Sequence, residues 1–191
     1  MRKLILFMHV SLDGFVDGPK GEMDWIKVDE EIFDYTGVLV DKADTALYGR
    51  VTYEMMENYW PTAADKPNAS KHDIEHSRWY SKVKKVVVSG TMSEKVPANT
   101  QIVGKDLTVE IQKLKQMPGS YILMLGSPRA SHSLMKLNLI DEFWLFLNPI
   151  ILGEGMPFFK NISDITKLKL AETKEFSSGV IALHYEKLKS E

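Results

Sequence analysis

Short continuous apolar runs alternate along the chain with stripes of apolar residues at helical spacing. The runs are typical of strands that are buried on both faces, and the stripes are typical of helices with one inward face. The expected strands are 3–10, 44–48, 85–89, 101–103, 122–125 and 141–147. The expected helices are 29–43, a helix that opens at 49, 71–83, 106–117 and 127–138, and the proline-containing segment 59–70 is expected to be a loop.

The C-terminal part of the chain has a different pattern. Two long strands are expected at 167–176 and 180–188, and the residues Ser177-Ser178-Gly179 between them favour a hairpin. Alternation of strands and helices favours a mostly parallel sheet, and the late hairpin adds an antiparallel edge. No repeat or linker divides the chain, so residues 1–191 are predicted to form one α/β domain.

Composition excludes several classes of function. The net charge is -2 and neither sign forms a long run, so nucleic-acid binding and membrane-surface binding have no electrostatic support. There are no cysteines, which excludes disulfides, thiol catalysis and thiolate metal sites. The apolar run at 3–10 is too short for the apolar region of a signal peptide, and no segment approaches the roughly 20 apolar residues of a membrane span, so a cytoplasmic location is the expectation.

The first candidate for chemistry is the glycine turn after the strand 122–125. Gly126 allows a sharp turn, Ser127 is expected to cap the following helix, and Pro128 suits its first position. A turn between a buried strand and a helix N-terminus presents N–H groups and the positive end of the helix dipole. This arrangement predicts a phosphate site.

A second junction of the same kind follows the strand 44–48. It reads Gly49-Arg50-Val51-Thr52-Tyr53-Glu54 and opens another helix. Its N–H groups and the Thr52 hydroxyl suit a diphosphate, and the planar guanidinium of Arg50 suits a terminal phosphate. The two junctions together fit the two ends of a dinucleotide.

These motifs carry a family resemblance. The segment 122–159 contains Gly126-Ser127-Pro128, Leu139-Ile140-Asp141-Glu142 and Pro149-Ile150-Ile151-Leu152-Gly153-Glu154-Gly155, and it follows Ser11-Leu12-Asp13-Gly14 and the 49–54 junction in the expected order. In this respect the whole chain resembles the dihydrofolate-reductase-like superfamily, in the branch related to the pyrimidine reductase of bacterial riboflavin biosynthesis. Met156-Pro157 before Phe158-Phe159 is a small departure from the usual pattern.

The resemblance implies a three-layer sandwich around a mostly parallel sheet of about eight strands with a C-terminal antiparallel hairpin. It also implies NADPH as cofactor, with Gly49 and Thr52 at the pyrophosphate, Arg50 near the 2′-phosphate and Ser89 at the adenosine ribose. The cofactor-binding residues expected on this basis are Gly49, Arg50, Thr52, Ser89, Gly126, Ser127 and Arg129. Ser11 to Gly14 would open a mobile loop beside the nicotinamide and the substrate.

The substrate side is less sharply defined. Asp13 is the polar candidate for catalysis, Trp25 is a candidate aromatic wall, and Glu154 is a candidate at the rim. In dihydrofolate reductases a carboxylate on the first helix handles the pterin. Asp29 or Glu30 lies near that position, but both are interpreted as ordinary residues of a helix start, which argues against folate.

The resulting hypothesis is an NADPH-dependent reductase of a small, flat heterocycle or conjugated carbonyl compound. Two alternatives stay open: a catalytically silent small-molecule or cofactor-binding protein on the same fold, and a stand-alone 5-amino-6-(5-phosphoribosylamino)uracil reductase. The aromatic strand at 143–146 is interpreted either as part of a homodimer interface or as a central strand covered on both faces.

One motif points elsewhere. His72-Asp73-Ile74-Glu75-His76 matches H-x-x-E-H, a zinc-protease motif, but a zinc site needs a further ligand. The other histidines share no obvious face with these two. The prediction is therefore a solvated amphipathic helix without a metal.

Overall fold

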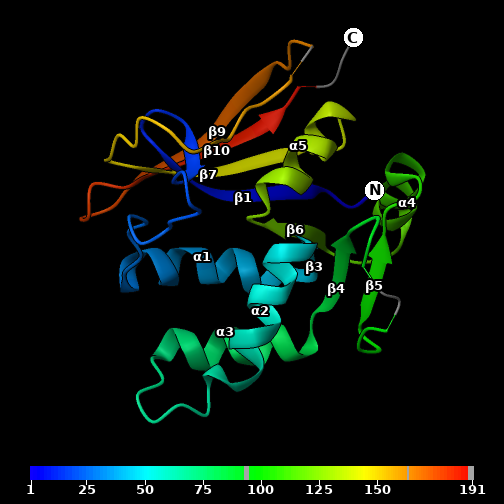
Figure 1. Cartoon of the computed structure of the whole chain (residues 1–191), viewed down its shortest axis with the longest axis horizontal. Coiled ribbons are helices and arrows are strands. Elements are labelled where there is room, and N and C mark those ends of the chain that lie inside the picture. Colours follow the sequence, from blue (N-terminus) through cyan, green and yellow to red (C-terminus); the bar gives the residue numbers. More distant parts are fainter. Residues whose placement is uncertain (93–94, 163, 189–191) are drawn as a thin grey trace.

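The computed structural model describes residues 1–92, 95–162 and 164–188. A sheet of eight strands runs through the molecule in the order β5-β4-β3-β6-β1-β7-β10-β9, and the strands from β5 to β7 are parallel (Figure 1). Its strands are β1 (Leu4–Ser11), β3 (Ala43–Gly49), β4 (Lys84–Val88), β5 (Thr100–Val103), β6 (Tyr121–Leu125), β7 (Glu142–Asn148), β9 (Leu168–Glu175) and β10 (Ile181–Lys187). The predicted fold class and the antiparallel C-terminal hairpin are confirmed.

Five helices join these strands, and their starts follow local sequence rules. They are α1 (Glu30–Lys42), α2 (Arg50–Ala63), α3 (Lys71–Lys82), α4 (Leu107–Gln116) and α5 (Pro128–Lys136). The side chains of Asp29, Ser70 and Asp106 accept backbone N–H groups at the starts of α1, α3 and α4. Each therefore satisfies an amide that has no partner within its helix.

The helices form two layers. The apolar side chains of α4 and α5 pack on one face of the sheet, around Leu6, Leu47 and Met124. Those of α1, α2 and α3 pack on the other face, around Ile5, Ala46 and Leu123, and Figure 1 shows these three helices grouped together. Neighbouring residues of one strand thus serve opposite layers, which confirms the expected three-layer sandwich.

The aromatic strand β7 has its partners within the chain. Phe143 and Phe146 are buried, and the ring of Trp144 lies 4.5 Å from that of His184 on β10. β7 lies between β1 and β10, which favours the interpretation as a covered central strand. The other apolar residues of the strand, Leu145 and Leu147, are partly buried, as is Trp144.

The structure corrects the first part of the loop expected at 59–70. α2 continues through Pro61 to Ala63, because Ser77 of α3 donates a hydrogen bond to the carbonyl of Trp60 over 2.7 Å and so holds the last turn against α3. A proline such as Pro61 costs a helix one hydrogen bond, but packing from a neighbouring helix can override that preference.

Residues 15–17 and 156–157 form a two-stranded ribbon of β2 (Phe15–Asp17) and β8 (Met156–Pro157).

No helix in the described part of the chain combines the length and the apolarity that a crossing of the bilayer requires.

Candidate cofactor and substrate site

The predicted glycine turns meet at one edge of the sheet. β3 and β6 are adjacent parallel strands, so Gly49, the last residue of β3, and Gly126, which follows β6, lie at the same edge. Ser11 ends β1, the neighbour of β6 on the other side. The edge where ligands bind in open α/β sheets therefore carries all three candidate segments.

The two turns contact each other directly. The N–H of Gly49 donates a hydrogen bond to Oγ of Ser127 over 2.7 Å. A Cβ atom at Gly49 would lie 3.2 Å from Cβ of Ala130 and 3.3 Å from Cβ of Ser127. Glycine at position 49 is therefore explained by the close approach of the two turns.

This contact corrects the expected role of Ser127. Ser127 begins α5 with φ of 66°, in the left-handed region, and its hydroxyl makes no capping bond to that helix. The Gly126 N–H donates to the carbonyl of Phe7 over 3.1 Å. The amides of Gly49 and Gly126 are thus both engaged within the protein, and neither is the bare donor that the sequence suggested.

The backbone N–H groups that remain available lie just after the glycine turns, in the first turns of α2 and α5. The first amides of a helix have no intrahelical acceptor, so the N–H groups of Arg50, Val51 and Thr52 at α2, and of Arg129 and Ala130 at α5, are suited to an anion. α2 and α5 leave adjacent strands and pack on opposite faces of the sheet. Such a divergence is the topological switch point at which α/β proteins bind dinucleotides.

Two arginines flank this point. The Arg50 guanidinium lies 3.2 Å from Glu54 in an exposed i,i+4 pair, an arrangement of small energetic value that a bound phosphate can replace. Arg129 is exposed, and no ion pair to it is recorded within the described ranges. Thr52 adjoins the other turn, since a Cβ at Gly126 would lie 3.8 Å from its Cγ2.

Ser89 lies at the same edge, just beyond β4, which is the neighbour of β3. Its hydroxyl accepts the N–H groups of Thr91 and Met92 over 3.2 and 3.0 Å. The hydroxyl therefore shapes its own turn.

Asp13 joins the loop after β1 to the glycine loop after β7. Its carboxylate accepts hydrogen bonds from the Ser11 hydroxyl over 2.7 Å and from the N–H groups of Leu152 and Gly153 over 3.1 and 2.7 Å. The Ser11 hydroxyl first, and then the two amides, lower the pKa of Asp13. Hydrogen bonds to a carboxylate favour its ionised form, and these bonds connect the 150–155 loop to the end of β1.

The β2–β8 ribbon is fixed to α5. His132 of α5 places Nε2 3.0 Å from the carbonyl oxygens of both Pro157 and Phe158. Because carbonyls only accept, Nε2 of His132 must carry the proton. At the other end of the ribbon a Cβ at Gly155 would lie 2.0 Å from the carbonyl oxygen of Asp17, which excludes any side chain there.

The remaining substrate candidates lie at the periphery. Trp25 is partly buried and donates its indole N–H to the carbonyl of Glu22 over 2.9 Å. Glu154 is exposed. Asp29 caps α1 by accepting the N–H of Ile32 over 2.9 Å, which confirms its interpretation as a helix-start residue.

Sequence reasoning missed two polar residues at the ends of β1 and β7. Nδ2 of Asn148 lies 3.4 Å from Nδ1 of His9, and Oδ1 of Asn148 accepts the N–H of Lys27 over 2.9 Å. Burial disfavours the imidazolium and lowers the pKa of His9 to about 4. A single histidine in an otherwise apolar strand at this edge was the available signal, and the apolar pattern concealed it.

The two histidines of the H-x-x-E-H segment pack against aromatic rings. His72 stacks on Phe33 with ring centroids 3.7 Å apart, and His76 packs on Trp60 at 4.0 Å. The two histidines are therefore partly buried, while Lys71, Glu75 and Arg78 of the same helix are exposed, as expected for an amphipathic helix. Within the described ranges the sole grouping with metal-binding geometry is Glu142, His184 and Glu186, where the Lys3 ammonium already pairs with both glutamates.

Comparison with known proteins decides the family. A model of the RibD C-terminal domain matches residues 2–182. The chain belongs to the RibD C-terminal domain family. This family comprises reductase domains with the dihydrofolate-reductase-like fold, so the sequence resemblance is confirmed at the level of family and fold.

Relatives of this family agree with the fold but leave the reaction open. The uncharacterized Bacillus subtilis protein YyaP is 35% identical over 186 residues, which are 96% of this chain and 94% of YyaP. A pyrimidine reductase-like protein of Corynebacterium diphtheriae is 18% identical with a TM-score of 0.69, covering 99% of this chain and 93% of that one. The Thermotoga maritima diaminohydroxyphosphoribosylaminopyrimidine deaminase/5-amino-6-(5-phosphoribosylamino)uracil reductase is 15% identical with a TM-score of 0.67, covering 98% of this RibD-family chain and 57% of that one.

Proposed function

We propose that this RibD-family protein is an NADPH-dependent reductase of a small, flat, pyrimidine-like heterocycle or a conjugated carbonyl compound. The observation that carries the proposal is the direct contact between the two glycine turns, through the Gly49 N–H and Ser127 Oγ. That contact brings two helix N-termini to one point of the sheet edge. A single diphosphate can then accept hydrogen bonds from both.

The residues at this edge fit the cofactor. The first-turn amides of α2 and α5 would hold the pyrophosphate, and the Thr52 hydroxyl adds a donor beside them. Arg50 and Arg129 are exposed cations at the two helix starts, and a guanidinium suits the 2′-phosphate that distinguishes NADPH from NADH. When bound, NADPH supplies a hydride, and the protein orients and encloses it.

The substrate space lies on the β1 side of the cofactor turns. Asp13 fixes the 150–155 loop over this edge, and Asn148 fixes the segment that contains Trp25. His9 is neutral at pH 7, and accepting a hydrogen bond from Asn148 at Nδ1 leaves its proton on Nε2. We propose Trp25 as an aromatic wall, Glu154 as a rim residue and Asp13 as a positioning residue for the substrate.

NADPH titration tests the proposal. The nicotinamide fluorescence of NADPH should shift saturably when protein is added. Arg50→Ala should lower the affinity for NADPH on the order of ten-fold and change the affinity for NADH by less than about two-fold. Glu54→Gln is the matched control, because it frees Arg50 from its ion pair without removing the guanidinium. Absence of saturable binding of either cofactor would remove the assignment.

The same experiment separates the alternatives. Cofactor binding without oxidation across pyrimidines, pterins and conjugated carbonyl compounds would favour a silent binding protein. The hydrogen bonds that lower the pKa of Asp13, from Ser11 first, support that alternative. Oxidation of NADPH with the ribosylaminopyrimidine substrate would favour the uracil reductase named for the Thermotoga maritima relative.

A further inference from the structure

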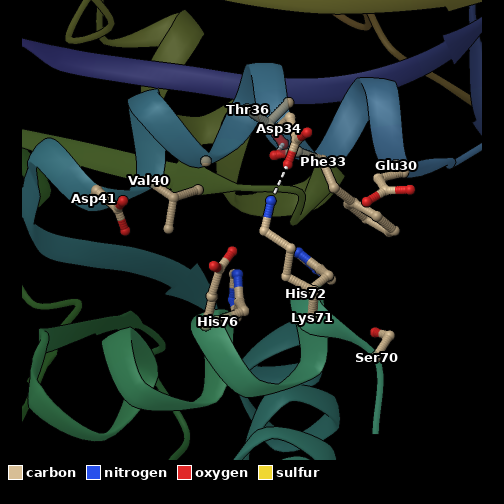
Figure 2. Close-up of a pocket in the computed structure, with 12 residues that line it drawn as sticks. Glu30, Phe33, Asp34, Thr36, Val40, Asp41, Ser70, Lys71, His72 and His76 are labelled. Atoms are coloured by element: carbon tan, nitrogen blue, oxygen red, sulfur yellow. Dashed lines mark hydrogen bonds and ion pairs between the residues drawn. The ribbon is translucent and has the colours of Figure 1, made fainter.

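A cleft of about 310 Å³ opens between α1 and α3, away from the glycine turns. Figure 2 shows side chains of α1 and α3 pointing toward each other across it. The cleft lies between two helices of the layer that covers one face of the sheet, and its lining contains no residue of 49–54 or 126–130. Its volume lies at the lower end of the range of small-molecule sites in proteins.

Rings form one wall of this cleft. His72 stacks on Phe33 within it, and His76 is backed by Trp60 and Trp79, whose ring centroids lie 4.0 and 5.0 Å away. Burial lowers the pKa of His72, and it lowers that of His76 to about 3. Both imidazoles are therefore neutral at pH 7 and contribute weakly polar ring surfaces.

Carboxylates form the rim. Four of them line the cleft, and the one ammonium among the lining residues, that of Lys71, lies 2.8 Å from Asp34 (Figure 2). The acidic lining residues are Glu30, Asp34, Asp41 and Glu75. The hydrogen bond from Lys71 to Asp34 first, and then the charges of Asp34, Glu75 and Glu30, raise the pKa of Lys71.

Gly37 keeps the floor of the cleft open. It lies in the middle of α1, where glycine is less favourable than alanine, and a Cβ atom there would meet nothing within 4 Å. Packing therefore does not require a glycine, and the helix would be more stable without it. An unfavourable residue that serves only to leave space is a feature of functional sites.

We infer that the α1–α3 cleft binds a small organic cation, an aromatic or alkyl amine, at a site separate from the reductase edge. Ring surfaces and carboxylates around an open space recognise an ammonium group attached to an apolar body. A metal ion is disfavoured, because His72 and His76 both pack against rings and, in the part of the chain that the structure describes, do not join a three-ligand cluster.

Titration calorimetry with benzylamine, and with benzyl alcohol and benzoate as neutral and anionic counterparts, tests this inference. Benzylamine should bind saturably, benzyl alcohol at least about ten-fold more weakly, and benzoate not at all. Asp41→Asn should weaken benzylamine about two- to five-fold, as expected for an exposed ion pair, and Asp65→Asn outside the cleft should have no effect.

A larger side chain at Gly37, which lines the cleft, gives a second test of the inference. Gly37→Leu should lower the affinity for benzylamine on the order of ten-fold or more. Val38→Leu, on the exposed side of the same helix, should change that affinity by less than about two-fold. Gly37→Ala should raise the melting temperature by about 2–4 °C. NADPH binding should be the same in all variants.

Three results would overturn the inference. One is the absence of saturable benzylamine binding, and another is equal affinity for benzylamine and benzyl alcohol. The third is a dimer in light scattering that Gly37→Leu converts to monomer, which would assign the cleft to a second copy of the chain.

Discussion

The hydroxyl of Ser127 accepts the backbone N–H of Gly49, a residue 78 positions earlier in the chain. This bond joins the starts of two helices that pack on opposite faces of the sheet. Ser127 holds the bond from a left-handed conformation with φ of 66°, which costs a residue with a Cβ about 1 kcal/mol. Strain that is maintained for one specific contact is typical of binding sites.

Substitution of Ser127 tests that contact. Ser127→Ala removes the acceptor of a partly buried N–H and keeps the strain, so the free energy of unfolding in urea should fall by about 1 kcal/mol. Ser127→Gly also removes the acceptor but relieves the strain, and should be about 1 kcal/mol more stable than Ser127→Ala. Both substitutions should lower the affinity for NADPH several-fold, as measured by fluorescence titration. Unchanged stability and affinity in both variants would contradict the role given to this bond.

Asp13 offers a test of positioning against proton donation. Asp13→Asn should weaken the hold on the amides of Leu152 and Gly153, so their hydrogen exchange should become faster. KM for the substrate should rise, because the 150–155 loop is less fixed. The pKa of Asp13 is already lowered, so the pH profile of kcat between pH 6 and 8 should keep its shape. If Asp13→Asn instead removed one pH-dependent phase of the kcat profile, Asp13 would be the proton donor.

Because the pKa of His9 is lowered by burial, the protein should lose stability in acid. Its folded-state pKa of about 4 lies below the unfolded value of 6.5, so the unfolded chain binds the proton more readily and stability falls as the pH drops from 6.5 toward 4. The free energy of unfolding from urea titrations should fall by about 2 kcal/mol between pH 7 and pH 5 through this residue. His9→Gln should remove that share of the loss, while the share due to His76 stays. Equal pH dependence in both proteins would show that His9 is not buried as neutral imidazole.

Local sequence signals predicted the strands, most helix starts and the late hairpin, because these depend on neighbouring residues. Asp29 caps α1, and Asn138 takes the left-handed conformation after α5 with φ of 56°, as their residue types favour. The continuation of α2 through Pro61 was not predictable, because it depends on Ser77 of another helix.

The site shows the same division between local and distant information. The sequence predicted a glycine turn after each of two buried strands, and the carboxyl ends of these adjacent parallel strands meet at one edge of the sheet. It did not show that Ser127 bonds to Gly49, or that Asp13 holds the 150–155 loop, because those partners are far apart in the sequence. The roles of Ser127 and Asp13 therefore came from tertiary contacts rather than from motifs.

The central claim is that the turns after β3 and β6 hold one dinucleotide together. Backbone amide NMR during an NADPH titration tests it most directly. The amides of Arg50 to Thr52 and of Arg129 and Ala130 should shift together with one shared Kd, whereas those of Gly37 and Asp41 in the α1–α3 cleft should not move. Shifts confined to one turn, different Kd values at the two turns, or no shift at either would contradict the claim.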